Sequence, residues 1–222
     1  MYKRVLAFGD SFTYGHDLED CHDTRPSNQT YSALLAGWLE VPYQCHAVGS
    51  NANQSITRNI LNADIQSNDL VIIMWTFEER QDFLFEGDRG WSSILPNNTD
   101  YFSTVFYKHV DKQLNYFQYL THKEIFLVQK YLDDIGVDHV HCCITSSLLE
   151  SINYRNSDLT KLIDTSNWIS MPGPVGFYDW AKSKSLLAKK TSGHANESAH
   201  RQLFEIIKQH MPGMILHQTN GP

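Results

Sequence analysis

Apolar and polar positions along the chain separate short strand-like runs from longer helix-like ones. The strand-like runs predict strands at residues 3–8, 43–48, 69–75 and 137–145. Helical spacing of apolar positions predicts helices at residues 30–39, 53–63, 102–119 and 123–135, and a last helix from residue 196 to about residue 210. Strands that alternate with helices indicate a parallel sheet with helices on both faces.

The other segments give weaker signals. Residues 69–75 are almost continuously apolar, which is typical of a central strand buried on both faces. Residues 85–99 are rich in Gly, Asp, Ser, Pro and Asn and predict a long loop. Residues 146–190 show little pattern beyond a turn at 172–174, and Pro212-Gly213 predicts the end of the last helix.

The bulk composition favours one domain over residues 1–222 and excludes some classes of protein. The chain has 222 residues, 41% of them hydrophobic, which is enough for one substantial core. A formal net charge of -7 argues against a nucleic-acid-binding surface. No run approaches the ~20 apolar residues of a membrane span, and no signal peptide is evident. We therefore expect a cytoplasmic protein, or a virion-associated one if a phage encodes it.

The four cysteines, at positions 21, 45, 142 and 143, have no CxxC spacing. Cys142 and Cys143 would point to opposite faces of a strand, so free thiols in a reducing compartment are expected. His139, His141 and Cys143 share one face and have the spacing of zinc ligands. Because no fourth ligand is evident, we expect neither a metal nor a cofactor.

The best candidate for chemistry is Ser11, in Gly9-Asp10-Ser11 directly after the first predicted strand. Open α/β sheets build their sites at the carboxyl ends of strands. A serine nucleophile needs a base, and His194 follows Gly193 just before the last helix. The alternatives are an ordinary capped turn at Ser11 and a solvated loop histidine at 194.

Three segments together resemble the GDSL/SGNH hydrolase superfamily, particularly the small variants of tailed phages. They are Gly9-Asp10-Ser11, the Gly49 turn after the second strand, and the segment from His194 to His200 before the last helix. The resemblance implies a flavodoxin-like three-layer α/β/α sandwich with a central parallel sheet. It also implies that Ser11 accepts the acyl group and that His194 is the general base, with Asp10 completing the catalytic motif. Members mostly cleave esters, including acetyl groups on carbohydrates.

The resemblance also points to the donors that would stabilise an oxyanion. These are the Ser11 amide and a second amide at Gly49, or at Ser50 if the register differs by one. The asparagine that the family carries after the third strand is absent, because this chain reads Trp75-Thr76-Phe77 there. Thr76 or Asn53 could substitute, and Asn51 is a further amide donor in the Gly49 segment. Alternatively, Asn53 caps the following helix.

The family's Asp-x-x-His is replaced by Thr191-Ser192-Gly193-His194, so the acid that orients the histidine is missing from its usual position. A backbone carbonyl or a carboxylate from elsewhere, such as Asp179, could replace it. Glu197 suits the positive end of the last helix better. A cluster of acidic residues between positions 17 and 23 follows Ser11 and could bind a cation, although a solvated loop is commoner.

Together with Ser11 and His194, the resemblance implies a serine-dependent ester hydrolase, a carbohydrate esterase or deacetylase acting on a small-molecule or glycan ester. The alternative is a catalytically weak or inactive binding or virion-structural protein with the same fold, attached to a larger assembly. A flavin or nucleotide binder is disfavoured, because the loop after the first strand is poor in glycine. Five aromatic residues could stack on a sugar if exposed: Trp91, Tyr101, Trp168, Tyr178 and Trp180.

Overall fold

The protein is built on a five-stranded, entirely parallel sheet in the order β2-β1-β3-β6-β7. A computed structural model describes residues 2–86, 90–110, 115–153, 158–173, 175–188 and 193–218. The strands are β1 (Val5–Phe8), β2 (Tyr43–Cys45), β3 (Leu70–Trp75), β6 (Asp138–Cys143) and β7 (Trp168–Ile169). The order reverses between β1 and β3, so the carboxyl end of β1 is a topological switch point, where ligands bind in such sheets.

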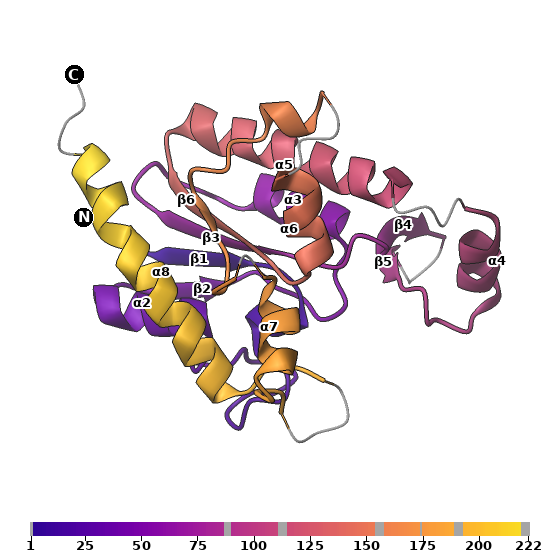
Figure 1. The fold of residues 1–222 in the computed structure, drawn as a ribbon, viewed down its shortest axis with the longest axis horizontal. Coiled ribbons are helices and arrows are strands. Elements are labelled where there is room, and N and C mark those ends of the chain that lie inside the picture. The colour runs from indigo at the N-terminus through magenta and orange to yellow at the C-terminus, as the bar shows by residue number, and fades with distance from the viewer. Residues whose placement is uncertain are drawn as a thin grey trace.

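Helices cover both faces of this sheet, as Figure 1 shows. On one face lie α2 (Tyr31–Leu39), α7 (Phe177–Ser183) and α8 (Glu197–Gln218). On the other lie α3 (Asn53–Asn62), α5 (Asn115–Ile135) and α6 (Ser146–Asn153). Within the described ranges, no helix is long and apolar enough to cross a membrane.

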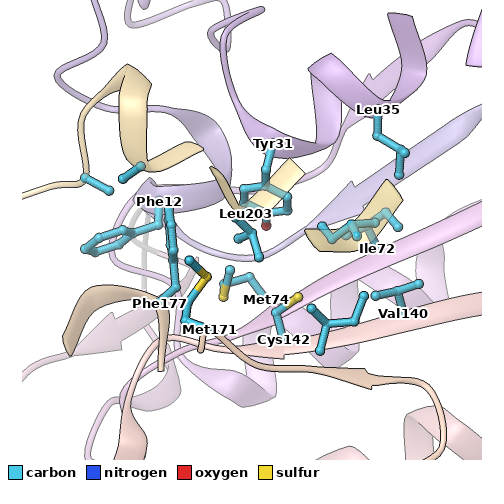
Figure 2. Packing of buried hydrophobic residues seen from close by; sticks show 14 of the residues in the cluster. Phe12, Tyr31, Leu35, Ile72, Met74, Val140, Cys142, Met171, Phe177 and Leu203 are labelled. Carbon is cyan, nitrogen blue, oxygen red and sulfur yellow. The ribbon is translucent and has the colours of Figure 1, made fainter. Parts of the chain in front are cut away.

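The core consists of two clusters, one on each side of the sheet. Along β3, Ile72 and Met74 belong to one cluster, whereas Ile73 and Trp75 belong to the other. Figure 2 shows the first cluster, in which strand side chains pack against those of α2, α7 and α8. Both faces of β3 are thus buried, as its apolar run predicts. The three-layer α/β/α fold class with a central parallel sheet is confirmed.

Adjacent Cys142 and Cys143 also follow this alternation. Cys142 lies in the cluster that contains Met74, and Cys143 in the one that contains Trp75. Their side chains therefore occupy opposite faces of β6, as the sequence predicts.

The main departure from the predicted elements lies between β3 and α5. Residues predicted as a loop contain β5 (Gly90–Ile94), which pairs antiparallel with β4 (Gln81–Phe85). Next comes α4 (Tyr101–His109), and the helix break falls near Val110, not near residue 120 as predicted. In Figure 1 this hairpin and α4 extend from one end of the sheet. A two-stranded ribbon depends on pairing between segments, so local composition did not reveal it.

The C-terminal third also differs from the prediction. Residues 146–190 contain α6, the 3-10 turn η2 (Thr160–Leu162), β7 and α7. Pro212 does not end the last helix, because α8 continues to Gln218. A proline inside a helix removes one main-chain donor and often only kinks it. Of the predicted turn at 172–174, Pro174 lies outside the described residues.

We expect Gly176→Ala to destabilise the fold strongly. A Cβ at Gly176 would lie 2.3 Å from the Thr145 carbonyl carbon and 2.4 Å from the Ile144 oxygen, and main chain cannot move aside easily. The free energy of unfolding should fall by about 3 kcal/mol. As a matched control, Gly37→Ala in α2 has open space around it and should raise stability by about 0.5–1 kcal/mol. Urea unfolding measures both variants, and equal effects would contradict the packing at Gly176.

Candidate active site

Ser11 lies at the carboxyl end of β1, as the first residue of the single-turn helix α1 (Ser11–Tyr14). The turn into this helix requires Gly9, because a Cβ there would come within 2.2 Å of Thr13 Oγ1. Asp10 caps the helix by accepting a hydrogen bond of 2.9 Å from the Phe12 N–H. At the other end, Gly15 closes the turn with φ +86°. The Ser11 side chain is thereby held at the switch point of the sheet.

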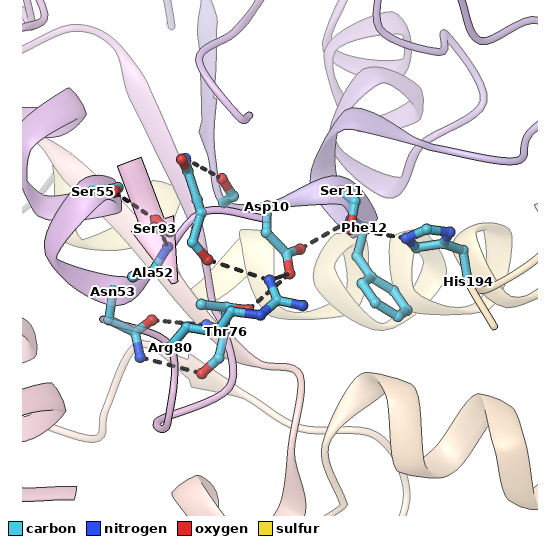
Figure 3. A network of polar contacts seen from close by, with 12 residues as sticks. Asp10, Ser11, Phe12, Ala52, Asn53, Ser55, Thr76, Arg80, Ser93 and His194 are labelled. Atoms are coloured by element: carbon cyan, nitrogen blue, oxygen red, sulfur yellow. Dashed lines mark hydrogen bonds and ion pairs between the residues drawn. The ribbon is translucent and has the colours of Figure 1, made fainter. Parts of the chain in front are cut away.

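His194 reaches Ser11 from the opposite end of the chain. Its Nε2 lies 2.9 Å from Ser11 Oγ, as drawn in Figure 3. Main-chain bonds from Ala188 N to His194 O and from Asn196 N to Leu186 O hold this segment in place. The Phe12 ring and the imidazole pack in a T-shaped arrangement at a centroid distance of 5.1 Å. The two residues that the sequence pairs as nucleophile and base are therefore in hydrogen-bond contact.

Asp17 supplies a carboxylate to the other side of His194. Its Oδ2 lies 2.9 Å from His194 Nδ1. Because a carboxylate accepts hydrogen bonds, this contact assigns the proton of a neutral imidazole to Nδ1 and leaves Nε2 to accept from the Ser11 hydroxyl. A hydroxyl, an imidazole and a carboxylate linked in this order can activate a serine nucleophile.

The loop that carries Asp17 is fixed from several sides. Asp17 itself has φ +71°, in the left-handed region that asparagine and aspartate tolerate better than most residues. The next residue, Leu18, is buried. Asp20 accepts hydrogen bonds from the Ser27 hydroxyl and from the Asn28 N–H. Part of the acidic cluster is thus structural, and Asp17 is the member that faces His194.

The carboxylate that contacts His194 Nδ1 belongs to Asp17 and not to Asp179, which the sequence had suggested for this role. The Asp179 carboxylate instead accepts a 2.7 Å hydrogen bond from the Ser146 N–H at the start of α6. Glu197 accepts from the Glu19 N–H and so ties the Asp17 loop to α8. Thr191 and Ser192, which precede His194 where the family acid would stand, lie outside the described residues.

The turn around Gly49 lies beside Ser11. Asn51 N donates to Val48 O at 3.3 Å, and Ser50 has φ +63°, which together make a tight turn. The Asn51 side chain donates to Gly9 O at 3.0 Å and fixes this turn to the end of β1. Within the described part of the chain, the N–H groups of Ser11, Gly49 and Ser50 have no hydrogen-bond acceptor. Main-chain donors of this kind can stabilise a developing oxyanion.

The two side chains suggested as substitute oxyanion donors are engaged elsewhere. The Asn53 side chain makes two hydrogen bonds to the main chain of Thr76. Its Oδ1 accepts from the Thr76 N–H at 2.9 Å, and its Nδ2 donates to the Thr76 carbonyl oxygen at 3.2 Å. Its Nδ2 also contacts Thr121 Oγ1 at 3.1 Å. The Thr76 hydroxyl donates to Asp10 Oδ2 at 2.7 Å. Asn53 is not the helix cap either, since Ala52 is the N-cap of α3. Asn53 thus joins α3 to the end of β3, and Thr76 joins the end of β3 to the end of β1.

Asp10 and Arg80 form a buried ion pair next to these groups. Arg80 Nη1 lies 2.7 Å from Asp10 Oδ2 and 3.3 Å from Asn51 O. The Asp10 side chain has no solvent exposure, and the guanidinium packs over the Phe77 ring. Asp10 therefore positions the nucleophile helix and does not contact His194 in place of Asp17. Arg80, a residue missed by sequence reasoning, bridges the end of β1 and the Gly49 turn.

His16 is a second imidazole at the site. Its ring centroid lies 5.8 Å from that of His194, and a Cβ at Gly49 would come within 2.9 Å of its Cε1 atom. Burial, and next the charge of His194, lower the pKa of His16. The ring is therefore mainly neutral near pH 7, and its contact explains why glycine is needed at position 49.

His200, the last residue of the resembling C-terminal segment, is structural. It stacks on Tyr31 at 5.8 Å and accepts a hydrogen bond from the Tyr31 N–H. Burial lowers the pKa of His200 to about 3, so the ring is neutral. The Tyr31 hydroxyl also bonds Thr13 Oγ1 at 2.8 Å, so the stacked pair of rings helps to hold α1 in position.

His139 and His141 bond each other instead of converging with Cys143 on one point. Trp75 Nε1 donates to His141 Nδ1 at 2.9 Å, and His141 Nε2 lies 2.9 Å from His139 Nδ1. His139 Nε2 then contacts Asp133 at 3.2 Å. Among the residues that the structure describes, no group of three or more His, Cys, Asp or Glu side chains is arranged to hold a metal.

The five aromatic residues considered for sugar stacking differ in exposure. Trp91 and Tyr101 are exposed, at 53% and 85%. Trp180 is buried in the core. Trp168 stacks on His141, and Tyr178 packs on Phe12. Trp91 and Tyr101 are therefore the most open of the five, Trp168 and Tyr178 are partly buried, and Trp180 is closed.

No protein-family model and no curated protein matches this sequence, but solved structures match its fold. A protein described as a lipolytic member of the G-D-S-L family from Desulfitobacterium hafniense DCB-2 has a TM-score of 0.50 at 12% identity, with 93% of this chain and 98% of that chain covered. Phospholipase A1 from Streptomyces albidoflavus NA297 has a TM-score of 0.53 at 11% identity, covering 94% and 99%.

A third match is a carbohydrate esterase whose active site displays divergent catalytic and non-catalytic binding functions. Its TM-score is 0.53 at 13% identity, over 96% of this chain and 66% of that chain. The chain has the GDSL/SGNH hydrolase fold. At these identities the likeness establishes the fold alone, so the activity of this SGNH-fold protein has to be argued from its own residues.

We expect Asp10→Asn to destabilise the protein, because it leaves the Arg80 guanidinium buried without a carboxylate. The free energy of unfolding should fall by about 3 kcal/mol in urea titrations. Asp10→Asn combined with Arg80→Met removes both charges and should recover part of this loss. Strictly additive effects of the two substitutions would contradict the ion pair.

Proposed function

We propose that this SGNH-fold protein is a serine-dependent ester hydrolase, a carbohydrate esterase or deacetylase. In this proposal Ser11 is the nucleophile, His194 the general base and Asp17 the residue that orients His194. The observation that carries it is the continuous pair of 2.9 Å contacts from Ser11 Oγ to His194 Nε2 and from His194 Nδ1 to Asp17 Oδ2. Hydrogen bonds of this length on both nitrogens fix the ring and its tautomer.

The reaction proceeds in two halves. Ser11 Oγ attacks the ester carbonyl carbon as its proton moves to His194 Nε2, and the Asp17 carboxylate stabilises the imidazolium. The bond to the alcohol oxygen then breaks, and that oxygen takes the proton from Nε2. Water next attacks the acyl-serine through the same base, releases the carboxylic acid and restores the Ser11 hydroxyl. No cofactor enters either half.

The oxyanion that forms in each half needs hydrogen-bond donors. The Ser11 N–H at the start of α1 and the N–H groups of Gly49 and Ser50 are candidates that supply main-chain dipoles without a side-chain amide. The bonds of Asn51 and Arg80 to the β1 end and to this turn support its position. Loss of one oxyanion donor costs roughly 10²–10³ in turnover in other serine hydrolases, so a slow enzyme is consistent with this site.

A second candidate function is a non-catalytic binding or virion-structural protein on the same fold. It is favoured by the absence of the family's asparagine after β3 and by the engagement of Asn53 and Thr76, its two candidate substitutes, in structural bonds. The solved carbohydrate esterase with divergent non-catalytic binding functions offers a parallel. Under this alternative, glycan binding would persist without ester hydrolysis. Neither candidate uses nucleic acid or a membrane as a partner.

The test is hydrolysis of p-nitrophenyl acetate by the wild type, Asp17→Asn and Asp179→Asn. Asp17→Asn should lower kcat by about 10³–10⁴, because an amide at this position favours the wrong tautomer of His194. Asp179→Asn is the matched control, since it removes a carboxylate of the same kind that caps α6, and it should leave kcat close to the wild-type value.

Equal kcat in Asp17→Asn and the wild type would contradict the orienting role of Asp17. Absence of hydrolysis by the folded wild type, on this ester and on acetylated sugars, would favour the non-catalytic alternative.

A further inference from the structure

A groove of about 410 Å³ is lined by residues of the Gly49 turn, of α3 and of the β4–β5 hairpin. One wall is α3, and the other is the β4–β5 hairpin, which the sequence did not reveal. Gly49 and Ser50, whose N–H groups face no acceptor in the described chain, also line it. The groove is thus connected to the carboxyl end of β1 through the Gly49 turn, because Asn51 of this turn bonds Gly9 O.

The walls of the groove are polar but carry no net charge. Arg58 of α3 and Asp82 of β4 form an ion pair across it, and the Asp82 side chain is almost fully buried. Ser93 of β5 bonds Asp82 at 3.4 Å and accepts a hydrogen bond from Ala52 N at 2.9 Å. Since the two charges neutralise each other, the groove favours neither an anion nor a cation. A long acyl chain would bind unfavourably here, because it would cover the hydroxyls and the ion pair without offering them hydrogen bonds.

Trp91 of β5 adds a flat aromatic surface to this polar groove. The Arg58 guanidinium lies over its ring at 4.5 Å from the centroid, which fixes the plane of the indole. Even so, 53% of Trp91 is exposed to solvent. An indole held rigidly with much of its surface open presents a negative π face, on which the C–H-bearing face of a sugar ring can pack. Few other neutral, water-soluble ligands combine such a face with many hydroxyl groups.

The groove continues beyond the length of one ring. Val48 and Asn59 line it and also line a neighbouring hollow of about 530 Å³ that reaches Arg4 and Asp64 at the edge of the sheet. The two hollows therefore adjoin at Val48 and Asn59. A saccharide longer than one ring has both hollows available to it.

We propose that this groove and the adjoining hollow bind a neutral oligosaccharide, with Trp91 as its stacking platform and Arg58, which Asp82 holds in place, donating to its hydroxyls. This proposal rests on the proposed function in one respect: the saccharide is the alcohol part of the ester whose acyl group is transferred to Ser11. The binding itself requires no turnover. The β4–β5 hairpin then determines specificity, because it supplies both Trp91 and Asp82.

The test uses fluorescently labelled protein on an array of neutral and acidic oligosaccharides. Ser11→Ala serves as the background, so that bound esters are not hydrolysed. This protein should bind one or more neutral oligosaccharides, and longer chains more tightly than the matching monosaccharide. Adding Trp91→Ala should raise the dissociation constant for those glycans about tenfold, the loss expected for one aromatic stacking contact.

Trp38→Ala in the same background is the matched control. Trp38 is a 42% exposed tryptophan on α2 with the Lys208 ammonium 5.3 Å from its ring centroid, so it resembles Trp91 but lies outside the groove. It should leave glycan binding unchanged. Circular dichroism of all three proteins checks that they are folded.

Binding to no neutral oligosaccharide, binding to acidic glycans alone, or equal dissociation constants for Trp91→Ala and Trp38→Ala would each overturn the proposal. Wild-type hydrolysis of p-nitrophenyl acetate is measured in parallel. Hydrolysis without glycan binding would refute the groove and leave the esterase intact. Glycan binding without hydrolysis of this ester or of acetylated sugars would support the groove and refute the esterase.

Discussion

The buried carboxylate of Asp10 is the constraint on which the site depends. It accepts hydrogen bonds from the Phe12 N–H, the Thr76 hydroxyl and the Arg80 guanidinium, and so joins the ends of β1 and β3 to the segment that leads into the hairpin. A carboxylate without solvent is stable only when its bonds are complete. Because it is also the cap of α1, the geometry that satisfies Asp10 determines where the Ser11 hydroxyl lies.

The position of the orienting acid shows how one arrangement can be built from a different part of the chain. His194 approaches Ser11 across 183 residues, whereas Asp17 follows Ser11 by six. The short path works because α1 is a single turn, ended by Gly15, and Asp17 adopts a left-handed backbone. The acid and the nucleophile therefore lie on the same short segment after β1. A hydrogen bond from the Glu19 N–H to the Glu197 carboxylate fixes this segment to α8. What the site requires is a carboxylate at Nδ1, regardless of its place in sequence.

Sequence predicted the features that depend on local pattern. The run in β3 is apolar because both its faces are buried, and glycines beside Ser11 and His194 mark the turns that present them. Asp17 stood in an acidic cluster that resembled a solvated loop, and only its backbone conformation singles it out. The β4–β5 hairpin depends on pairing between segments, and its half-exposed strands lack a clear alternation. The ends of helices and strands, and the hydrogen-bond partners of Asn53 and Thr76, are likewise determined by contacts with other parts of the fold and not by local sequence.

The most direct test of an activated serine is labelling with a fluorophosphonate, which reacts covalently with a nucleophilic hydroxyl, followed by peptide mapping. The account predicts that the wild type carries the label on the peptide that contains Ser11 and that His194→Ala, folded but without the base, carries none. An unlabelled wild type would contradict it, as would a label that persists at Ser11 in His194→Ala or that lies on another residue.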